Sequence, residues 1–413
     1  MNFSAILLIA GLFFVYSLLS RRISSSFLTA PMIFTAAGLL IAQFVPGLFG
    51  DTIDHSFVHL LAELTLIFVL FTDAAAIDFG KLRTDYGLAA RLLLIGLPLT
   101  IAAGLAAALL VFEILTFWEA ALLAAILAPT DAALGQSVVT SKIVPLRIRQ
   151  TISVESGLND GICLPLVLIF AGVAGMMQSD AAVLAQFTIL QITMGPVAGA
   201  AVGFVGAKLI DFAVDKNSIS ASMEGIAALC VALVAFALAE TVHGNGFIAA
   251  FIAGLTFGSI LRHKCRFLYE FAESEGQFFT LSTFLIFGAV AIPLIGQNFE
   301  RSYLLYAVLS LTVIRMLPVV FSLLGSKTRL ATAGFLGWFG PRGLASILFA
   351  LLIVEREHIS GGKQIISIVV VTVLLSVILH GVTAAGLSGT YGRYMRDVGV
   401  CPENENNTEE DGS

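Results

Sequence analysis

The chain has few charged residues for its length of 413 residues. Only 12% of them are Asp, Glu, Lys or Arg, whereas a soluble domain carries about 25%. Hydrophobic residues make up 58% of the chain, and the mean hydropathy is +0.96. This composition excludes an ordinary soluble domain and predicts a protein that crosses a membrane many times.

Cysteine is also scarce, and the four cysteines show no spacing typical of a metal site. Cys163 and Cys230 lie within predicted membrane spans, and Cys265 and Cys401 lie on the predicted cytoplasmic side. We therefore expect no disulfide. The basic residues are scattered among predicted loops, so no nucleic-acid partner is expected.

Apolar runs long enough to span a bilayer recur along the whole chain. A spanning helix needs about 20 apolar residues, and about thirteen such runs are present. They lie near residues 3–20, 27–45, 58–79, 87–112, 117–140, 150–177, 183–211, 222–241, 244–261, 277–297, 303–325, 331–354 and 364–390. The first run begins at Asn2 without a basic leader, which favours a retained span over a cleaved signal peptide.

The positions of the basic residues predict the orientation in the membrane. With the N-terminus outside, the outward loops hold only Arg301, Arg356 and Lys363, and two arginines, Arg315 and Arg342, lie inside spans. All other Lys and Arg residues then face inward. The positive-inside rule therefore supports thirteen spans in the cell membrane, with the N-terminus outside and the C-terminus cytoplasmic.

We expect two parts in the chain. Residues 1–398 form a single transmembrane domain, and residues 399–413 form a short acidic cytoplasmic tail that is disordered. No regulatory domain is expected after the last span, so any response to pH would arise within the membrane part.

Two predicted spans are interrupted by a proline beside an ionisable residue. Pro129-Thr130-Asp131 interrupts the fifth span, and Gly340-Pro341-Arg342-Gly343 interrupts the twelfth. Because proline lacks a backbone donor, each span is expected to break into two half-helices. Such paired breaks indicate an inverted-repeat transporter, although two simple kinks are the alternative. The opposite charges of Asp131 and Arg342 suit the exposed ends of half-helices.

The sixth span contains Glu155-Ser156-Gly157-Leu158-Asn159-Asp160. A charged carboxylate at mid-span disfavours insertion by about 2.5–3.5 kcal/mol, so such residues usually serve function. Helical spacing puts Ser156 and Asp160 on one row and Glu155 and Asn159 on the next. Ser156 and Asp160 offer oxygen ligands for a hard cation, and Asn159 can hydrogen-bond to the nearby break. The alternative for Asp160 is a carboxylate neutralised by burial or by an arginine.

Together these three motifs resemble those of the monovalent cation–proton antiporter superfamily. More narrowly, they resemble its electroneutral branch, which contains the bacterial NhaP-type sodium/proton antiporters and the animal sodium/proton exchangers. The resemblance implies an all-α polytopic membrane fold of about thirteen helices, with inverted repeats and two broken, crossing helices. It further implies a core bundle that moves against a dimerisation domain, and a homodimer surrounded by membrane lipid. The protein would be a transporter and not an enzyme, with no cofactor beyond the transported ions.

The resemblance also implies the roles of the site residues. Asp160 would bind either the cation or the proton, and Thr130, Asp131, Ser156 and Asn159 would assist it. Among these, Asp160, Ser156 and Thr130 would supply the ligands of the monovalent cation. Alternating access would then exchange the two ions across the membrane.

Three further groups of ionisable residues receive weaker interpretations. The resemblance implies that Glu155 forms a buried ion pair, with Arg315 as the first candidate partner and Arg342 as the second. Asp73 matches an acidic position in the third span of some relatives, where it contributes to an ion funnel, but a surface acid is the equal alternative. Glu63, in the same span, is left without a role.

The order Asn159-Asp160 resembles that of the electroneutral exchangers, which trade one cation for one proton. The resemblance favours sodium as the cation, lithium is also accepted by such ligands, and a K⁺/H⁺ antiporter is the runner-up. A cation channel lined by Asp160 and Asp131 is an alternative from another class. An intramembrane protease is disfavoured, because the serine motif Gly386-Leu387-Ser388-Gly389 has no histidine after it.

Overall fold

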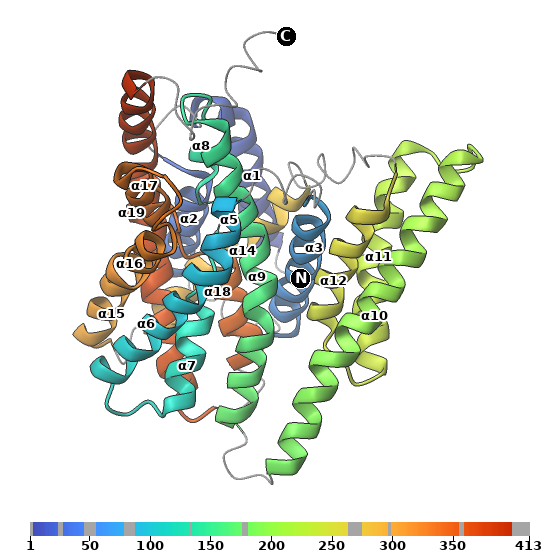
Figure 1. Cartoon of the computed structure of the whole chain (residues 1–413), viewed down its shortest axis with the longest axis horizontal. Coiled ribbons are helices and arrows are strands. Elements are labelled where there is room, and N and C mark those ends of the chain that lie inside the picture. The colour runs from blue at the N-terminus through green and yellow to red at the C-terminus, as the bar shows by residue number, and fades with distance from the viewer. Residues whose placement is uncertain are drawn as a thin grey trace.

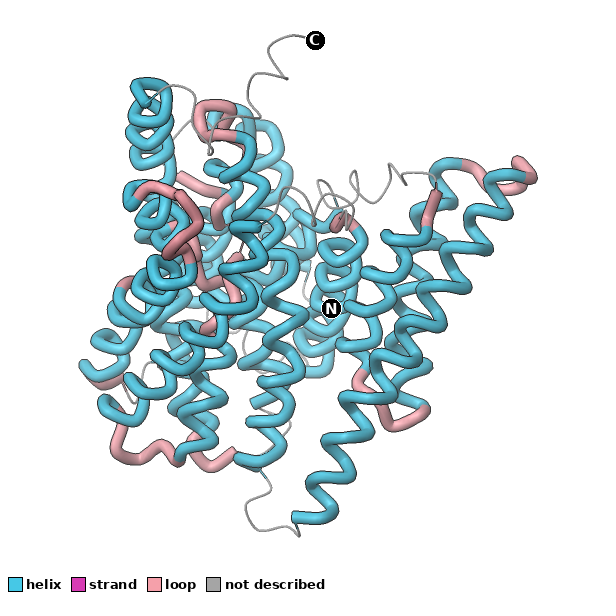
Figure 2. The backbone as a smooth tube through the Cα atoms, viewed as in Figure 1, coloured by secondary structure: helices cyan, strands magenta, loops and turns pink. Residues whose placement is uncertain are grey.

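A computed structural model of the chain describes residues 3–23, 28–44, 55–77, 87–131, 134–175, 181–262, 275–295, 299–354 and 359–398. Within these ranges every regular element is a helix, and none is a strand (Figure 2). The all-helical prediction is therefore confirmed for this part of the chain. The predicted acidic tail over residues 399–413, together with Cys265 and Cys401, lies outside the described residues.

The first part of the chain runs from α1 to α10. Its helices are α1 (Phe3–Ile23), α2 (Ala30–Phe44), α3 (His55–Ala75), α5 (Gly87–Arg91), the π-helical segment η1 (Leu92–Gly96), α6 (Leu97–Val111), α7 (Phe117–Ile126), α8 (Gln136–Val139), α9 (Leu146–Gly175) and α10 (Ala181–Asp215). Here α5, η1 and α6 form one continuous helical segment. A capping box at Thr116 and Glu119 fixes the start of α7.

The second part of the chain runs from α11 to α19. Its helices are α11 (Ala221–Thr241), α12 (Gly246–Ile260), α14 (Glu275–Ile295), α15 (Arg301–Leu311), α16 (Val313–Ser322), α17 (Leu330–Trp338), α18 (Leu344–Phe349), the π-helical segment η2 (Ala350–Val354) and α19 (Gly362–Val398). A proline lies inside each of α9, α10 and α16.

Six helical segments among the described residues are long and apolar enough to cross a membrane. They are Gly87–Val111, Leu146–Gly175, Ile189–Asp215, Met223–Thr241, Arg301–Ser322 and Gly362–Val398. Four shorter apolar helices accompany them, at Ala30–Phe44, Phe117–Ile126, Gly246–Ile260 and Gly276–Ala291. This agrees with a multi-pass membrane protein, while the count of thirteen spans remains a prediction.

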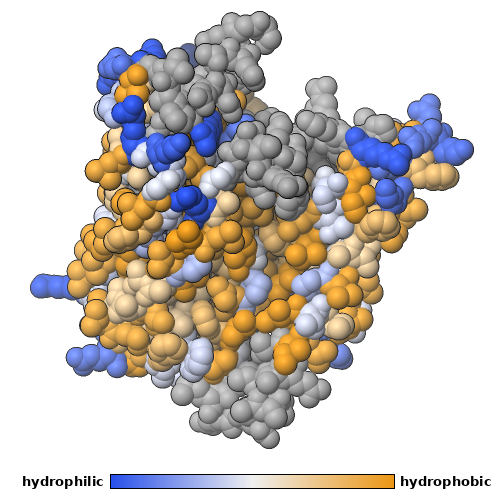
Figure 3. All heavy atoms as spheres, viewed as in Figure 1, coloured by the Kyte–Doolittle hydropathy of each residue, from blue (hydrophilic) through white to orange (hydrophobic). Residues whose placement is uncertain are grey.

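The surface also suits a lipid environment. Large hydrophobic side chains stand exposed along several helices, including Leu7 on α1, Leu94 on η1 and Leu110 on α6, which is 86% exposed. Figure 3 shows hydrophobic residues covering the middle of the visible face, with hydrophilic residues mainly near its upper and lower margins. So much exposed apolar surface would be unusual in water and is expected in a bilayer.

In Figure 1, α9 lies between α10, α11 and α12 on one side and α6, α7 and α15 on the other. The helices on these two sides form two groups. In one group, α12 packs against α3, α10 and α11, while α14 packs against α2 and contacts both α3 and α19. In the other, α7 packs against α6 and α9, α15 packs against α19, and α16 packs against α17. The motif-bearing helix α9 therefore has its site residues next to the seam between the two groups.

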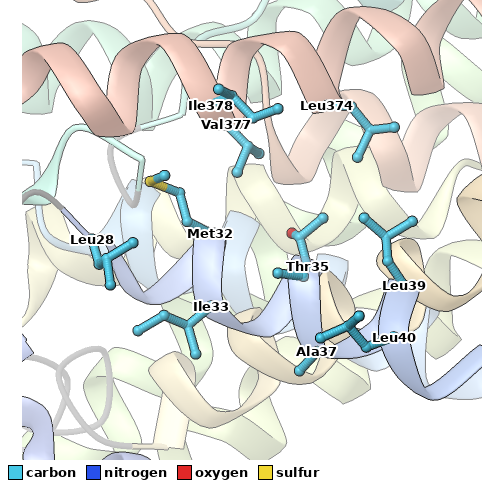
Figure 4. A pocket seen from close by; sticks show the side chains of 11 residues that line it. Leu28, Met32, Ile33, Thr35, Ala37, Leu39, Leu40, Leu374, Val377 and Ile378 are labelled. Carbon is cyan, nitrogen blue, oxygen red and sulfur yellow. The ribbon is translucent and has the colours of Figure 1, made fainter. Parts of the chain in front are cut away.

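A cavity of about 500 Å³ lies between α2 and α19. Figure 4 shows its lining, where the helices contribute aliphatic side chains such as Leu39 and Val377, with Met32 and the hydroxyl of Thr35. No ionisable residue is among the described residues that line it. This cavity is therefore not the ion site that the sequence predicts.

Candidate ion-binding site

Both predicted helix breaks are present, and they meet. α7 ends at Ile126, and the chain is non-helical from Pro129 to Asp131. α17 ends at Trp338, and α18 begins only at Leu344. The backbone N–H of Asp131 donates a hydrogen bond to the carbonyl of Pro341 over 2.8 Å, which joins the two breaks directly.

Each break supplies the charge that compensates the half-helix end of the other. The guanidinium of Arg342 donates through Nη1 to the carbonyls of Ala128 and Pro129, just after the C-terminal end of α7. The carboxylate of Asp131 accepts the N–H of Leu344 over 2.7 Å at the N-terminal end of α18. Ser346 of α18 also donates to the carbonyl of Ile126 over 2.8 Å. Cation and anion thus lie where the helix dipoles favour them.

The two glycines of the second break leave room for charged groups. A methyl group added at Gly343 would overlap the carboxylate of Asp131, with its Cγ only 2.7 Å away. A methyl group at Gly340 would overlap the guanidinium of Arg315, with Cζ at 2.8 Å. The spacing Gly340-Pro341-Arg342-Gly343 therefore has a packing reason on both sides of the proline.

This packing gives a prediction for Gly343→Ala. Because the new methyl group would displace the Asp131 carboxylate from α18, we expect a loss of about 1–3 kcal/mol in the free energy of unfolding, typical of overpacking. Gly334→Ala in α17 is the matched control, because a methyl group there meets nothing within 4 Å. Thermal unfolding in detergent would compare the two variants, and equal unfolding temperatures would contradict the assigned contact.

α9 is fastened to the first break by two hydrogen bonds to one residue. Ser156 donates its hydroxyl hydrogen to the carbonyl of Thr130 over 2.6 Å, and the amide of Asn159 donates to the hydroxyl of Thr130 over 2.7 Å. All three side chains are buried. Thr130 thus joins the break to the same turn of α9 that carries Asp160.

Asp160 is nearly buried at 9% exposure, and its Oδ1 has no hydrogen-bond partner among the described residues. The side-chain oxygen Oδ1 of the neighbouring Asn159 is in the same condition. Asp73 and Asp131 lie close enough for their charges to act on Asp160. Buried oxygens are normally satisfied, so this arrangement suits a ligand that accepts lone pairs, such as a cation or a proton.

Asp73 lies on α3, half-buried, and faces α9 across the seam between the helix groups. A methyl group at Gly157 would come within 3.6 Å of Asp73 Cβ, and Gly157 precedes Asp160 by one turn. Glu63 is also half-buried but lies about three turns earlier on α3, so it is not part of this cluster.

The arginine that contacts Glu155 is Arg315. Its Nη1 lies 2.7 Å from Oε1, and its Nη2 donates to Oε2 over 2.9 Å. The two side chains are 1% and 3% exposed. Arg342, the second candidate in the sequence, instead uses its guanidinium at the end of α7. Arg315 therefore pairs with Glu155, whereas Arg342 binds the carbonyls that follow the C-terminal end of α7.

Sequence reasoning missed three buried polar residues, one at the start of α7 and two beside the second break. Glu119 accepts the N–H of Gly361 over 2.6 Å and so ties the start of α7 to the start of α19. Ser376 and His380, buried on α19, contact the second break. A signal for them was present, because a serine and a histidine four residues apart in a membrane span are expensive to bury without a partner.

Comparison with known proteins identifies the family of this chain. A family model described as "Sodium/hydrogen exchanger, transmembrane" matches residues 6–388. The K(+)/H(+) antiporter NhaP of Alkalimonas amylolytica is 26% identical over 391 residues, which cover 91% of this chain and 65% of that protein. The K(+)/H(+) antiporter NhaP2 of Shewanella sp. (strain MR-4) is 24% identical, covering 94% of this chain and 67% of that protein. The chain thus spans about two thirds of the length of these relatives.

Among solved structures, the sodium proton antiporter MjNhaP1 from Methanocaldococcus jannaschii at pH 8 is similar in fold. It superposes with a TM-score of 0.74 at 20% sequence identity, over 94% of this chain and 99% of that chain. From the family match over residues 6–388, the chain belongs to the sodium/hydrogen exchanger family.

Proposed function

We propose that the protein is a secondary active antiporter that exchanges a monovalent cation for a proton at Asp160. The observation that carries this proposal is the nearly buried Asp160 Oδ1, which has no hydrogen-bond partner among the described residues and lies beside a broken helix. Membership of the sodium/hydrogen exchanger family supports the same activity.

Competition for one carboxylate would couple the two ions. When Asp160 is ionised, it attracts a cation, and oxygens of Ser156, Thr130 and Asn159 lie on the same side of α9 to complete the ligand set. Ser156 uses its hydrogen on Thr130, so its lone pairs stay available. When Asp160 is protonated, the charge that holds the cation is absent. Asp160 would therefore carry either a cation or a proton at any moment, and never both.

The helix breaks would form the mobile part of the transporter. We infer that the helices around the two breaks act as a core bundle that moves against the group containing α3, α10 and α12, and that α9 carries Asp160 along the seam. The further expectations are thirteen spans within residues 1–398, a cytoplasmic tail over residues 399–413, an outside N-terminus and a homodimer. Asp73, on the opposite side of the seam, would guide the cation toward Asp160.

Exchange would be electroneutral, with one cation traded for one proton. Asn159, a neutral residue, precedes Asp160, so one carboxylate titrates at this point of α9. The proposed cation is sodium or potassium. Relatives named K(+)/H(+) antiporter favour potassium, whereas the named activity of MjNhaP1 favours sodium. Carboxylate and hydroxyl oxygens accept either ion, and the choice depends on the fit and field strength of the site.

Proteoliposomes with an acid interior test the proposal. We expect external sodium, lithium or potassium to collapse the pH gradient in proportion to its affinity for the site, with the membrane potential clamped at zero. Imposing a potential should leave the rate unchanged, because an uncompensated charge would gain about 2.3 kcal/mol per 100 mV and an electroneutral cycle gains none.

Two outcomes would contradict this proposal. A current that follows the cation gradient without proton movement would favour a channel. A rate that grows with membrane potential would exclude one-for-one exchange. Liposomes without protein give the background leak for both measurements.

A further inference from the structure

Two polar residues on α19, Ser376 and His380, lie against the second break. Ser376 is fully buried and His380 is 1% exposed. They are one helical turn apart, so they share a face of α19. On the neighbouring face, Gly381 packs so closely against Met32 of α2 that a methyl group would overlap its sulfur. α19 is therefore held between α2 and the break.

Hydrogen bonds connect these two residues to both sides of the break. His380 Nε2 lies 2.9 Å from the carbonyl of Trp338, the last residue of α17, and a carbonyl can only accept. Nε2 therefore carries a hydrogen. On the other side of the ring, Nδ1 lies 3.2 Å from the hydroxyl of Ser376, which accepts the backbone N–H of Arg342 over 2.8 Å.

If the His380 ring is neutral with its hydrogen on Nε2, each hydrogen bond in this series has one donor and one acceptor. Arg342 N–H donates to Ser376, the Ser376 hydroxyl donates to Nδ1, and Nε2–H donates to Trp338. The carbonyl of Ser376 also lies 3.0 Å from Nδ1, a contact that only a doubly protonated ring could use as a donor here. Together, His380 and Ser376 thus link Trp338, at the end of α17, to the backbone of Arg342 on the other side of the break.

The same series leads on to the ion site. Arg342, fixed by Ser376 at its backbone, reaches the carbonyls of Ala128 and Pro129 with its guanidinium. The next residue, Thr130, holds Ser156 and Asn159 of α9. A shift of Arg342 would therefore move the first break and, through Thr130, the oxygens beside Asp160.

We propose that His380 and Ser376 are positioning residues for the cation site, which set the place of Arg342 and hence of Thr130 without touching the cation. This inference rests on the proposed antiport function. It predicts that loss of the series weakens cation binding, expressed as KM, more than it lowers the maximal exchange rate. A role confined to packing would lower stability and leave KM unchanged.

The test uses four variants of the full chain in proteoliposomes. We expect His380→Leu and Ser376→Ala to raise the KM for the transported cation about tenfold, the effect of losing one net hydrogen bond. His380→Gln should stay within about twofold of wild type, because an amide keeps one donor and one acceptor. Thr383→Val is the matched control: it removes the partner of the Trp338 indole, 3.0 Å away, but not the series to Arg342. Its KM should be that of wild type.

Wild-type exchange is measured first, because inactive wild-type protein would overturn the proposed function itself. With active wild type, an unchanged KM in Ser376→Ala or His380→Leu overturns the positioning role. An equal rise in KM for Thr383→Val, or failure of His380→Gln to rescue, also overturns it. Thermal unfolding of each variant shows whether it is folded, and Ser376→Ala decides the question if His380→Leu does not fold.

Discussion

Asp160→Asn is expected to reduce exchange to the leak of protein-free liposomes, for every cation and at every pH. The amide has nearly the shape of the carboxylate but neither titrates nor carries charge, so it can hold neither ion in competition with the other. Asp160 Oδ1 has no hydrogen-bond partner among the described residues, so the substitution breaks no hydrogen bond at that oxygen. The variant should fold and assemble like wild type.

Asp211→Asn is the matched control for this variant. Asp211 is also a buried carboxylate, on α10, but it accepts the backbone N–H of Arg262 over 3.1 Å, a bond that the amide oxygen of Asn can keep. We expect normal exchange from it. The measurement is the cation-driven collapse of a pH gradient, made on protein that elutes as a folded species. Residual exchange in Asp160→Asn that still depends on cation concentration would move the coupling site to Asp73 or Asp131.

Sequence patterns predicted the parts of this site that depend on local chemistry. The prolines at 129 and 341, each beside an ionisable residue, correctly indicated the two breaks. Proline alone was not sufficient, because the prolines inside α9, α10 and α16 leave those helices continuous. The helical period of α9 predicts that Asn159 reaches the nearby break, and its amide does contact Thr130 there. The opposite charges of Asp131 and Arg342 also indicated compensation of helix ends.

What the sequence could not predict are the partners that come from distant helices. For Glu155, spacing alone left two arginines open, because both lie in late spans. The family resemblance ranked Arg315 first, and the structure shows that Arg315 is the partner. The spacing likewise did not show that Arg342 reaches back to residues more than 200 positions earlier. These contacts depend on the packing of whole helices, which the spacing of residues along the sequence does not reveal.

The buried pair of Glu155 and Arg315 gives the largest expected effect on stability. Arg315→Met should lower the free energy of unfolding by about 3–5 kcal/mol, because it leaves the Glu155 carboxylate buried without its partner. Such a loss is a large fraction of the stability of most proteins. We expect poor expression and a much lower unfolding temperature in detergent. Both side chains are nearly inaccessible, so water cannot solvate the Glu155 carboxylate once the guanidinium is gone.

Replacing both partners distinguishes the effect of the ion pair from the effect of the volume that the two side chains fill. In Glu155→Met/Arg315→Met no unpaired charge is left, and replacement of a whole buried pair by apolar side chains is often neutral. The double variant should therefore recover most of the stability that Arg315→Met loses, with a positive coupling in a double-mutant cycle. Additive losses in the cycle would show that the two residues do not act as a pair. Recovery of stability together with exchange would assign the pair to the scaffold, because the ion path through Asp160 would then work without it.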